Sequence, residues 1–161
     1  MSANKSELKS RKRVDYPFIR DYRTRWNDND VFQHMNNAVY VFLYDSVLST
    51  YLTEKCNLQL STSPQIAVVV HSHSDYFAQI AFPAVAEVGL RANKIGRSSV
   101  VWEMGLFERG LEEVRAVGEF VQVWVDKETR KPLKEGLTGD IRKAIDALYM
   151  GPNLEKKKSK L

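Results

Sequence analysis

The sequence predicts an α+β domain in which one long helix packs against an antiparallel sheet. Residues 37–53 carry apolar side chains at helical spacing. Residues 65–126 contain four runs in which apolar and polar side chains alternate, separated by short turn segments. A helix and a sheet that each carry an apolar face bury these faces against each other. The length of 161 residues favours one domain with one core.

The first half of the chain supplies a strand and the helix. Residues 1–15 are polar and basic, and we expect a flexible segment there. Side chains alternate over residues 17–26, which predicts a first strand. The helix follows over residues 37–53, with Asn36 or Asn37 as its N-cap. Its apolar stripe is wide, so we expect most of the helix surface to be covered.

The second half is mostly strand. Four further strands are predicted over residues 65–77, 84–96, 98–110 and 112–126. Turn residues Gly96 and Gly110 separate successive strands, which predicts an antiparallel meander. A short helix is expected over residues 138–150, and a flexible tail over 151–161. The single folded domain is therefore expected to span residues 16–150.

Composition excludes several classes of protein. No run approaches the roughly 18 apolar residues that a membrane span needs, and the N-terminal residues lack the apolar core of a secretory signal. The single cysteine, Cys56, excludes an internal disulfide and fits a reducing compartment. Part of the net charge of +4 lies at the two ends of the chain, without interleaved aromatics, so no nucleic-acid partner is expected.

The segment WNDNDVFQHMNNAVY places polar side chains directly before the helix. A helix N-terminus offers unpaired N–H groups and a partial positive charge, which can hold an oxyanion. A carboxylate near such a helix start can act as a base or a nucleophile, and two aspartates, Asp28 and Asp30, precede this helix. The alternative is that both aspartates only form turns and Asn37 only caps the helix.

The residues RWNDNDVFQHMNNAVYVFLYDSVLSTYL resemble the helix-leading segment of hotdog-fold acyl-CoA thioesterases, the 4-hydroxybenzoyl-CoA thioesterase-like family. The portion HMNNAVY is also similar to plant acyl-carrier-protein thioesterases, and IGRSSVVWEMGLF resembles a hairpin of the family. The resemblance covers residues 16–130. It implies a hotdog fold, an antiparallel sheet wrapped around a long central helix. It further implies hydrolysis of an acyl-CoA substrate to free CoA and a carboxylic acid, without cofactor or metal.

The resemblance also implies roles for residues near the helix start. Asp30 corresponds to the catalytic carboxylate, the backbone N–H of Asn37 to an oxyanion donor, and Tyr40 to a substrate-binding residue in the first turn. His34 matches a histidine of the plant-type pattern. Phe32 stands where that pattern has an asparagine, so a complete Asp/Asn/His set is not present. His34 is then expected either to transfer a proton or to orient the loop or a water molecule.

Other members carry an active glutamate on the long helix. Asp45 is the one acidic residue of this helix before Glu54. We expect Asp45 to line the substrate pocket or a subunit contact rather than to act in catalysis.

Four further residues are candidates for substrate binding. His71 and His73 lie two apart on a predicted strand and face the same side, as a zinc-binding pair would. No third ligand is evident, so we expect a pocket or interface role and no metal. Arg97 and Ser98 follow a turn glycine and are candidates for contact with the phosphates of CoA. An ordinary exposed turn is the equal alternative.

The chain ends in Ser159, Lys160 and Leu161. SKL at a free carboxyl end is a peroxisomal import address that an import receptor binds. Peroxisomal localisation is therefore expected, or a cytoplasmic one if this ending is accidental.

Alternative functions stay open at this point. A hotdog module that binds acyl-CoA without turnover is one, and a hydratase or dehydratase acting on acyl thioesters is another. A single sheet of this kind leaves a free edge, so we expect a homodimer or homotetramer with the active site at the subunit interface.

Overall fold

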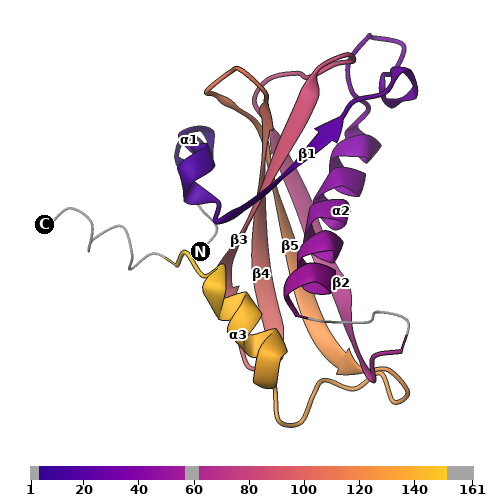
Figure 1. Ribbon diagram of the computed structural model, residues 1–161, viewed down its shortest axis with the longest axis vertical. Coiled ribbons are helices and arrows are strands. Elements are labelled where there is room, and N and C mark those ends of the chain that lie inside the picture. The colour runs from indigo at the N-terminus through magenta and orange to yellow at the C-terminus, as the bar shows by residue number, and fades with distance from the viewer. Residues whose placement is uncertain (1–3, 57–61, 152–161) are drawn as a thin grey trace, which may run out of the picture.

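The computed structural model describes residues 4–56 and 62–151, which form one five-stranded antiparallel sheet and its covering helices (Figure 1). The elements in chain order are α1 (Lys5–Lys9), the 3-10 turn η1 (Arg13–Asp15), β1 (Phe18–Arg23), the 3-10 turn η2 (Trp26–Asp28), α2 (Asn37–Lys55), β2 (Gln65–Tyr76), β3 (Val85–Ile95), β4 (Ser99–Glu108), β5 (Val114–Asp126) and α3 (Gly139–Ala147). The predicted α+β class is confirmed, with the sheet curving around α2 as the hotdog fold requires.

The strand order in the sheet is β1-β3-β4-β5-β2. The predicted meander is present in β3, β4 and β5, but β2 lies outside it. β2 pairs with β5 at the far edge, from Gln65 opposite Asp126 to Tyr76 opposite Ala116. The residues after β2 carry the chain to the other side of the sheet, where β3 pairs with β1. This crossover corrects the expectation that successive strands are neighbours throughout, and it leaves β1 and β2 as the edges.

The helix α2 packs one side against the sheet. Asn36 caps it, since its Oδ1 accepts a hydrogen bond from the Ala38 N–H at 2.9 Å. The buried side chains of α2 share one core cluster with Phe120 and Trp124 of β5. The opposite side of α2 is open in the single chain: Phe42 is 65% exposed. The expectation of a helix covered on most sides is therefore corrected, because the sheet of one chain wraps only one side.

No described helix is long and apolar enough to cross a membrane.

Gly118 of β5 allows α2 to approach the sheet. A Cβ at Gly118 would lie 2.4 Å from Cε2 of Tyr44, a fully buried ring of α2. We expect Gly118→Ala to lower the free energy of unfolding by about 1–3 kcal/mol, because the ring or the backbone must move. Urea unfolding measures this loss, and an unchanged midpoint would mean that the helix does not lie this close.

The N-terminal segment covers the other face of the sheet. Leu8 of α1 and Tyr16 form a second core cluster with side chains of β4 and β5 (Figure 1). The ring of Tyr16 lies over Gly89 and Gly105, where a Cβ would collide with it. These contacts correct the expectation of a flexible segment over residues 1–15, since residues 4–15 are folded onto the sheet.

A charged network ties this segment down. Arg11, 7% exposed, donates from Nε to Glu103 Oε1 at 2.9 Å and from Nη2 to Oε2 at 3.3 Å. The Tyr16 hydroxyl donates to Glu103 Oε1 at 3.0 Å, and the Asn93 amide donates to Oε2 at 2.8 Å. Basic residues in a polar segment suggest solvation, but here a buried carboxylate of β4 provides the partner that makes burial of Arg11 favourable.

Candidate active site

The polar segment before α2 is a closed loop. Asn29 and Met35 form an isolated antiparallel bridge across it. Within the loop, the Asp30 N–H donates to the His34 carbonyl at 2.8 Å. The Asp28 carbonyl accepts from the Asn36 N–H at 2.8 Å, which fastens the loop to the start of the helix. Asp30 and His34 are thus held side by side through their backbones, one loop ahead of α2.

The carboxylate of Asp30 uses one of its two oxygens in the loop. Oδ1 accepts from the Phe32 N–H at 2.8 Å and from the His34 N–H at 3.4 Å. Within the described residues, no hydrogen bond involves Oδ2. Asp30 is therefore a turn former, as the alternative interpretation has it, and its second carboxylate oxygen has no hydrogen-bond partner in that part of the chain.

Asp28 has a different environment. Its side chain is buried and accepts hydrogen bonds from the backbone N–H of Arg25 at 2.6 Å and from the Arg25 guanidinium at 2.8 Å. Burial alone would raise the pKa of Asp28, but the hydrogen bonds and charge of Arg25 outweigh it and lower the pKa. Asp28 is thus an ionised structural group. Of the two aspartates, Asp30 is the one whose carboxylate keeps an oxygen without a hydrogen-bond partner among the described residues.

The start of α2 supplies a hydrogen-bond donor. Asn37 is the first residue of this helix of 19 residues and is exposed. No acceptor for the Asn37 N–H is present among the residues that the structure describes. The aligned peptide dipoles place a partial positive charge at this end. An anionic oxygen at this position would be stabilised by both.

His34 and Tyr40 occupy contrasting positions. His34 is half-buried, and its ring makes no hydrogen bond within the described part of the chain. Tyr40 is buried beneath the helix start, with its ring 5.1 Å from that of Tyr76 in an edge-to-face contact. Burial raises the pKa of Tyr40, and a hydrogen bond with the Ile80 backbone opposes the shift. In the single chain, Tyr40 supports the helix start rather than presenting its hydroxyl to solvent.

Asp45 lies two turns along α2, on the open side of the helix. His71 and His73 lie on the face of the sheet turned away from α2, because their neighbour Ser74 faces Tyr44 of the helix. The structure therefore does not bring these three residues together with Asp30.

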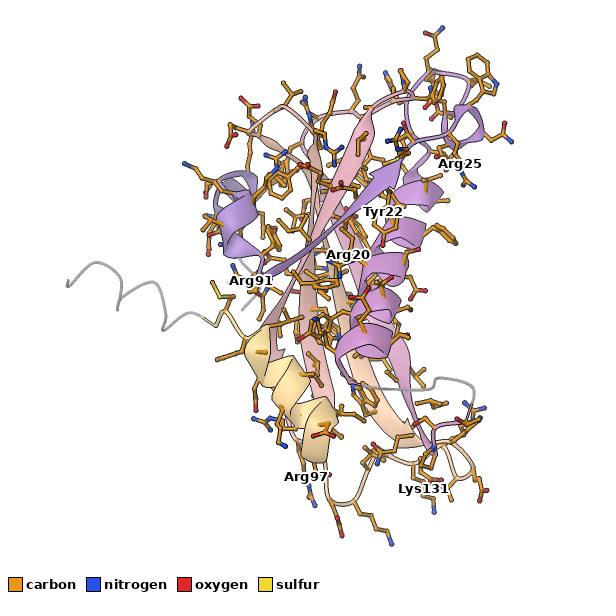
Figure 2. The ribbon with its side chains drawn as sticks, in the orientation of Figure 1. Arg20, Tyr22, Arg25, Arg91, Arg97 and Lys131 are labelled. Carbon is orange, nitrogen blue, oxygen red and sulfur yellow. The ribbon has the colours of Figure 1, made fainter. Side chains whose placement is uncertain are left out.

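Arg97 and Ser98 lie at the opposite end of the molecule from the loop that carries Asp30. Figure 2 shows Arg97 at one end of the molecule and Arg25, which leads into the loop of Asp30, at the other. The Arg97 guanidinium donates to the Lys134 carbonyl, and the Ser98 carbonyl accepts from the Trp124 N–H at 2.7 Å. Within one chain, this turn is separate from the start of α2.

An apolar rim beside the loop was not predicted. Its members are exposed aromatic or branched side chains: Trp26, Val31, Phe32 and Phe82. The rings of Trp26 and Phe82 meet edge to face with centroids 6.2 Å apart. The signal in the sequence is the pair Val31-Phe32 inside an otherwise polar segment, whereas the contribution of Phe82 depends on the tertiary fold.

A family model and known proteins match most of the chain. The family model of the thioesterase-like superfamily matches residues 24–144. The crystal structure of the PA5185 protein from Pseudomonas aeruginosa superposes with a TM-score of 0.82 at 38% identity, covering 86% of this chain and 95% of that chain. The protein YsmA of Bacillus subtilis is 25% identical over 119 residues, which are 74% of this chain and 80% of YsmA.

A more distant match shows the shared fold. Slr0204 from Synechocystis, a 1,4-dihydroxy-2-naphthoyl-CoA thioesterase, superposes with a TM-score of 0.72 at 15% identity. The match covers 86% of this chain and 97% of that chain. At this identity, the similarity concerns the arrangement of the helix and strands alone.

Proposed function

The chain belongs to the thioesterase-like superfamily, and from this premise we propose that it hydrolyses acyl-CoA thioesters to free CoA and a carboxylic acid. One observation carries the proposal: the Asn37 N–H at the start of α2 lies one loop after the Asp30 carboxylate, and neither this N–H nor Asp30 Oδ2 has a hydrogen-bond partner in the described part of the chain. Thioester hydrolysis requires these two groups, an oxyanion donor and a base or nucleophile.

In the proposed reaction, the thioester carbonyl oxygen accepts the hydrogen bond of the Asn37 N–H. Asp30 either takes a proton from water, which then attacks the carbonyl carbon, or attacks that carbon directly. In both routes, the carbon–sulfur bond breaks and CoA leaves as a thiolate that is then protonated. In the direct route, water subsequently cleaves the anhydride with Asp30. His34 has the backbone contacts of a residue that shapes the loop.

We assign the acyl group to the exposed apolar side chains next to the site. Val31 and Phe32 of the loop and Phe42 of α2 are exposed in the single chain. An acyl chain that covers them removes apolar surface from water. Arg97 lies at the far end of the molecule from this loop, so Arg97 and its neighbour Ser98 would reach the CoA of this site from a second copy.

A panel of acyl-CoA esters of increasing chain length, aliphatic and aromatic, tests the function. Steady-state release of the CoA thiol is the expected result for at least one ester. Saturable binding without thiol release would instead favour the non-catalytic module. Loss or gain of acyl-chain unsaturation with the thioester intact would favour a hydratase or dehydratase.

The free edge of β2 supports the proposal that two chains assemble. Val70 is 60% exposed on this strand, and its neighbours Val68 and Val69 are also exposed. Exposed apolar edges pair with other strands unless charges protect them.

We expect light scattering to give at least twice the chain mass of 18.5 kDa. We expect Val70→Lys to favour the monomer, whereas Val14→Lys, at an exposed valine of η1, leaves the mass unchanged. An active wild-type monomer would contradict this prediction.

We retain peroxisomal import as a proposal. It rests on Ser159, Lys160 and Leu161, which lie outside the described residues. Removing these three residues is expected to leave thioesterase activity and the melting temperature unchanged and to move the protein from peroxisomes to the cytosol of a eukaryotic cell. Fluorescence microscopy measures the distribution. A full-length protein that stays cytosolic would show that this ending is not used as an address.

A further inference from the structure

Three side chains with metal-ligand chemistry meet near the free edge of the sheet. His71 and His73 lie on β2, and Glu119 of β5 is directly opposite His73. Their donor atoms all lie within 4.8 Å of one another. The two imidazole rings have centroids 5.6 Å apart, and Nδ1 of His73 is 3.9 Å from Oε1 of Glu119. The sheet register thus supplies the third ligand that the sequence did not reveal.

This cluster is separate from the proposed thioesterase site. On β5, Gly118 lies against Tyr44 of α2, so the next residue, Glu119, points to the other face of the sheet. On β2, Ser74 contacts Tyr44, so His73 also points away from the helix. The hydrolysis proposed above therefore makes no use of these residues.

The charges around Glu119 favour a cation. In the register of β4 with β5, Glu119 lies opposite Glu103. Glu103 has Arg11 and Asn93 as partners, whereas His73 is the only basic side chain that the described residues bring within ion-pair distance of Glu119. Arg11 and Arg91 already offset the charge of Glu103. A bound cation would give Glu119 a charged partner of its own.

The donor set indicates which cation. Two imidazoles and a carboxylate suit zinc and its neighbours, whereas calcium and magnesium prefer oxygen ligands alone. Donors around a tetrahedral zinc ion lie roughly 3.4 Å apart, so these side chains would have to rotate closer to one another to bind it. We propose that His71, His73 and Glu119 bind one divalent transition-metal ion of the zinc class, with water completing its coordination. The bound ion would link β2 to β5.

Metal titration of untagged protein tests the proposal. Zinc and cobalt are expected to bind at one ion per chain, and cobalt gives a visible absorption band. His71→Ala, His73→Ala and Glu119→Gln are each expected to weaken binding at least about tenfold, since even the loss of a ligand's supporting partner costs that much. His34→Ala is the matched control, because His34 is the one histidine of the sequence outside the cluster.

Thermal unfolding gives a second readout. Zinc is expected to raise the melting temperature of the wild type and of His34→Ala but not of His73→Ala, since an ion that binds only the folded chain stabilises it. Magnesium at the same concentration is expected to have no effect. The proposal is overturned if the wild type does not bind zinc at concentrations on the order of 1 mM, or if the three ligand variants bind as tightly as the wild type. A metal-free contact of His73 with Glu119 would then be the role of the cluster.

Discussion

Asp30→Asn is expected to reduce kcat for acyl-CoA hydrolysis roughly a hundred- to ten-thousandfold, the range that the loss of a general base produces. Asparagine has nearly the same shape, and its Oδ1 still accepts the N–H groups of Phe32 and His34 that hold the loop. What it removes is the negative charge and the free oxygen of the carboxylate. Steady-state release of the CoA thiol measures the loss.

The retained fold must be shown beside the lost rate. An unchanged melting temperature and unchanged binding of the acyl-CoA ester would place the defect in the chemical step. Phe32→Ala provides a loop variant that keeps the carboxylate, and its effect is expected mainly in KM through the apolar rim. Wild-type turnover by purified Asp30→Asn would exclude Asp30 as base and as nucleophile.

Arg11→Ala is expected to lower the free energy of unfolding by about 3–5 kcal/mol, because it leaves the Glu103 carboxylate buried without its guanidinium. Glu103 is 1% exposed and Arg11 7%. Arg142→Ala is the matched control: Arg142 pairs with Asp146 at 2.9 Å, but both side chains are exposed. Its expected cost is below about 1 kcal/mol. Urea unfolding of the three proteins measures the difference, and equal losses would contradict the prediction.

The same network predicts a dependence on pH. Burial by itself would raise the pKa of Glu103, but its hydrogen bonds and its attraction to Arg11 and Arg91 outweigh burial and lower the pKa. A lowered pKa means that this stabilisation is fully present above the ordinary glutamate pKa of about 4.3 and is lost as the pH falls further. We expect the wild type to lose stability in acid more steeply than Glu103→Gln.

The elements of the fold were predictable because their signals are local. Asn36 as N-cap, the helical spacing after it and the turn glycines mark α2 and the meander directly. The pairing of β2 with β5 was not predictable, because both strands alternate in a similar way and nothing in the sequence states which edge β2 joins. The burial of Arg11 was missed for the same reason, since its partner Glu103 is 92 residues away.

The candidate site also has a part that the sequence could predict and a part that it could not. Asp30, His34 and Asn37 lie within eight residues of each other, and the closed loop and the start of α2 hold them together. Arg97 is separated from this loop by the length of the molecule, which a sequence pattern does not encode. The position of Glu119 beside His73 follows from strand register alone, so no spacing in the sequence indicates it.

β2 pairs with β5, a strand that comes much later in the chain, and this order matters during protein synthesis. A ribosome releases the chain from its N-terminus, so the valines at positions 68–70 emerge well before β5 has been translated. At about 5–20 residues per second, this interval lasts seconds. During it, β2 is an apolar strand without its partner, which other nascent chains can bind. Translation that stalls before residue 114 should therefore yield aggregates rather than a smaller folded unit, and the soluble yield should depend on codon speed and chaperones between β2 and β5.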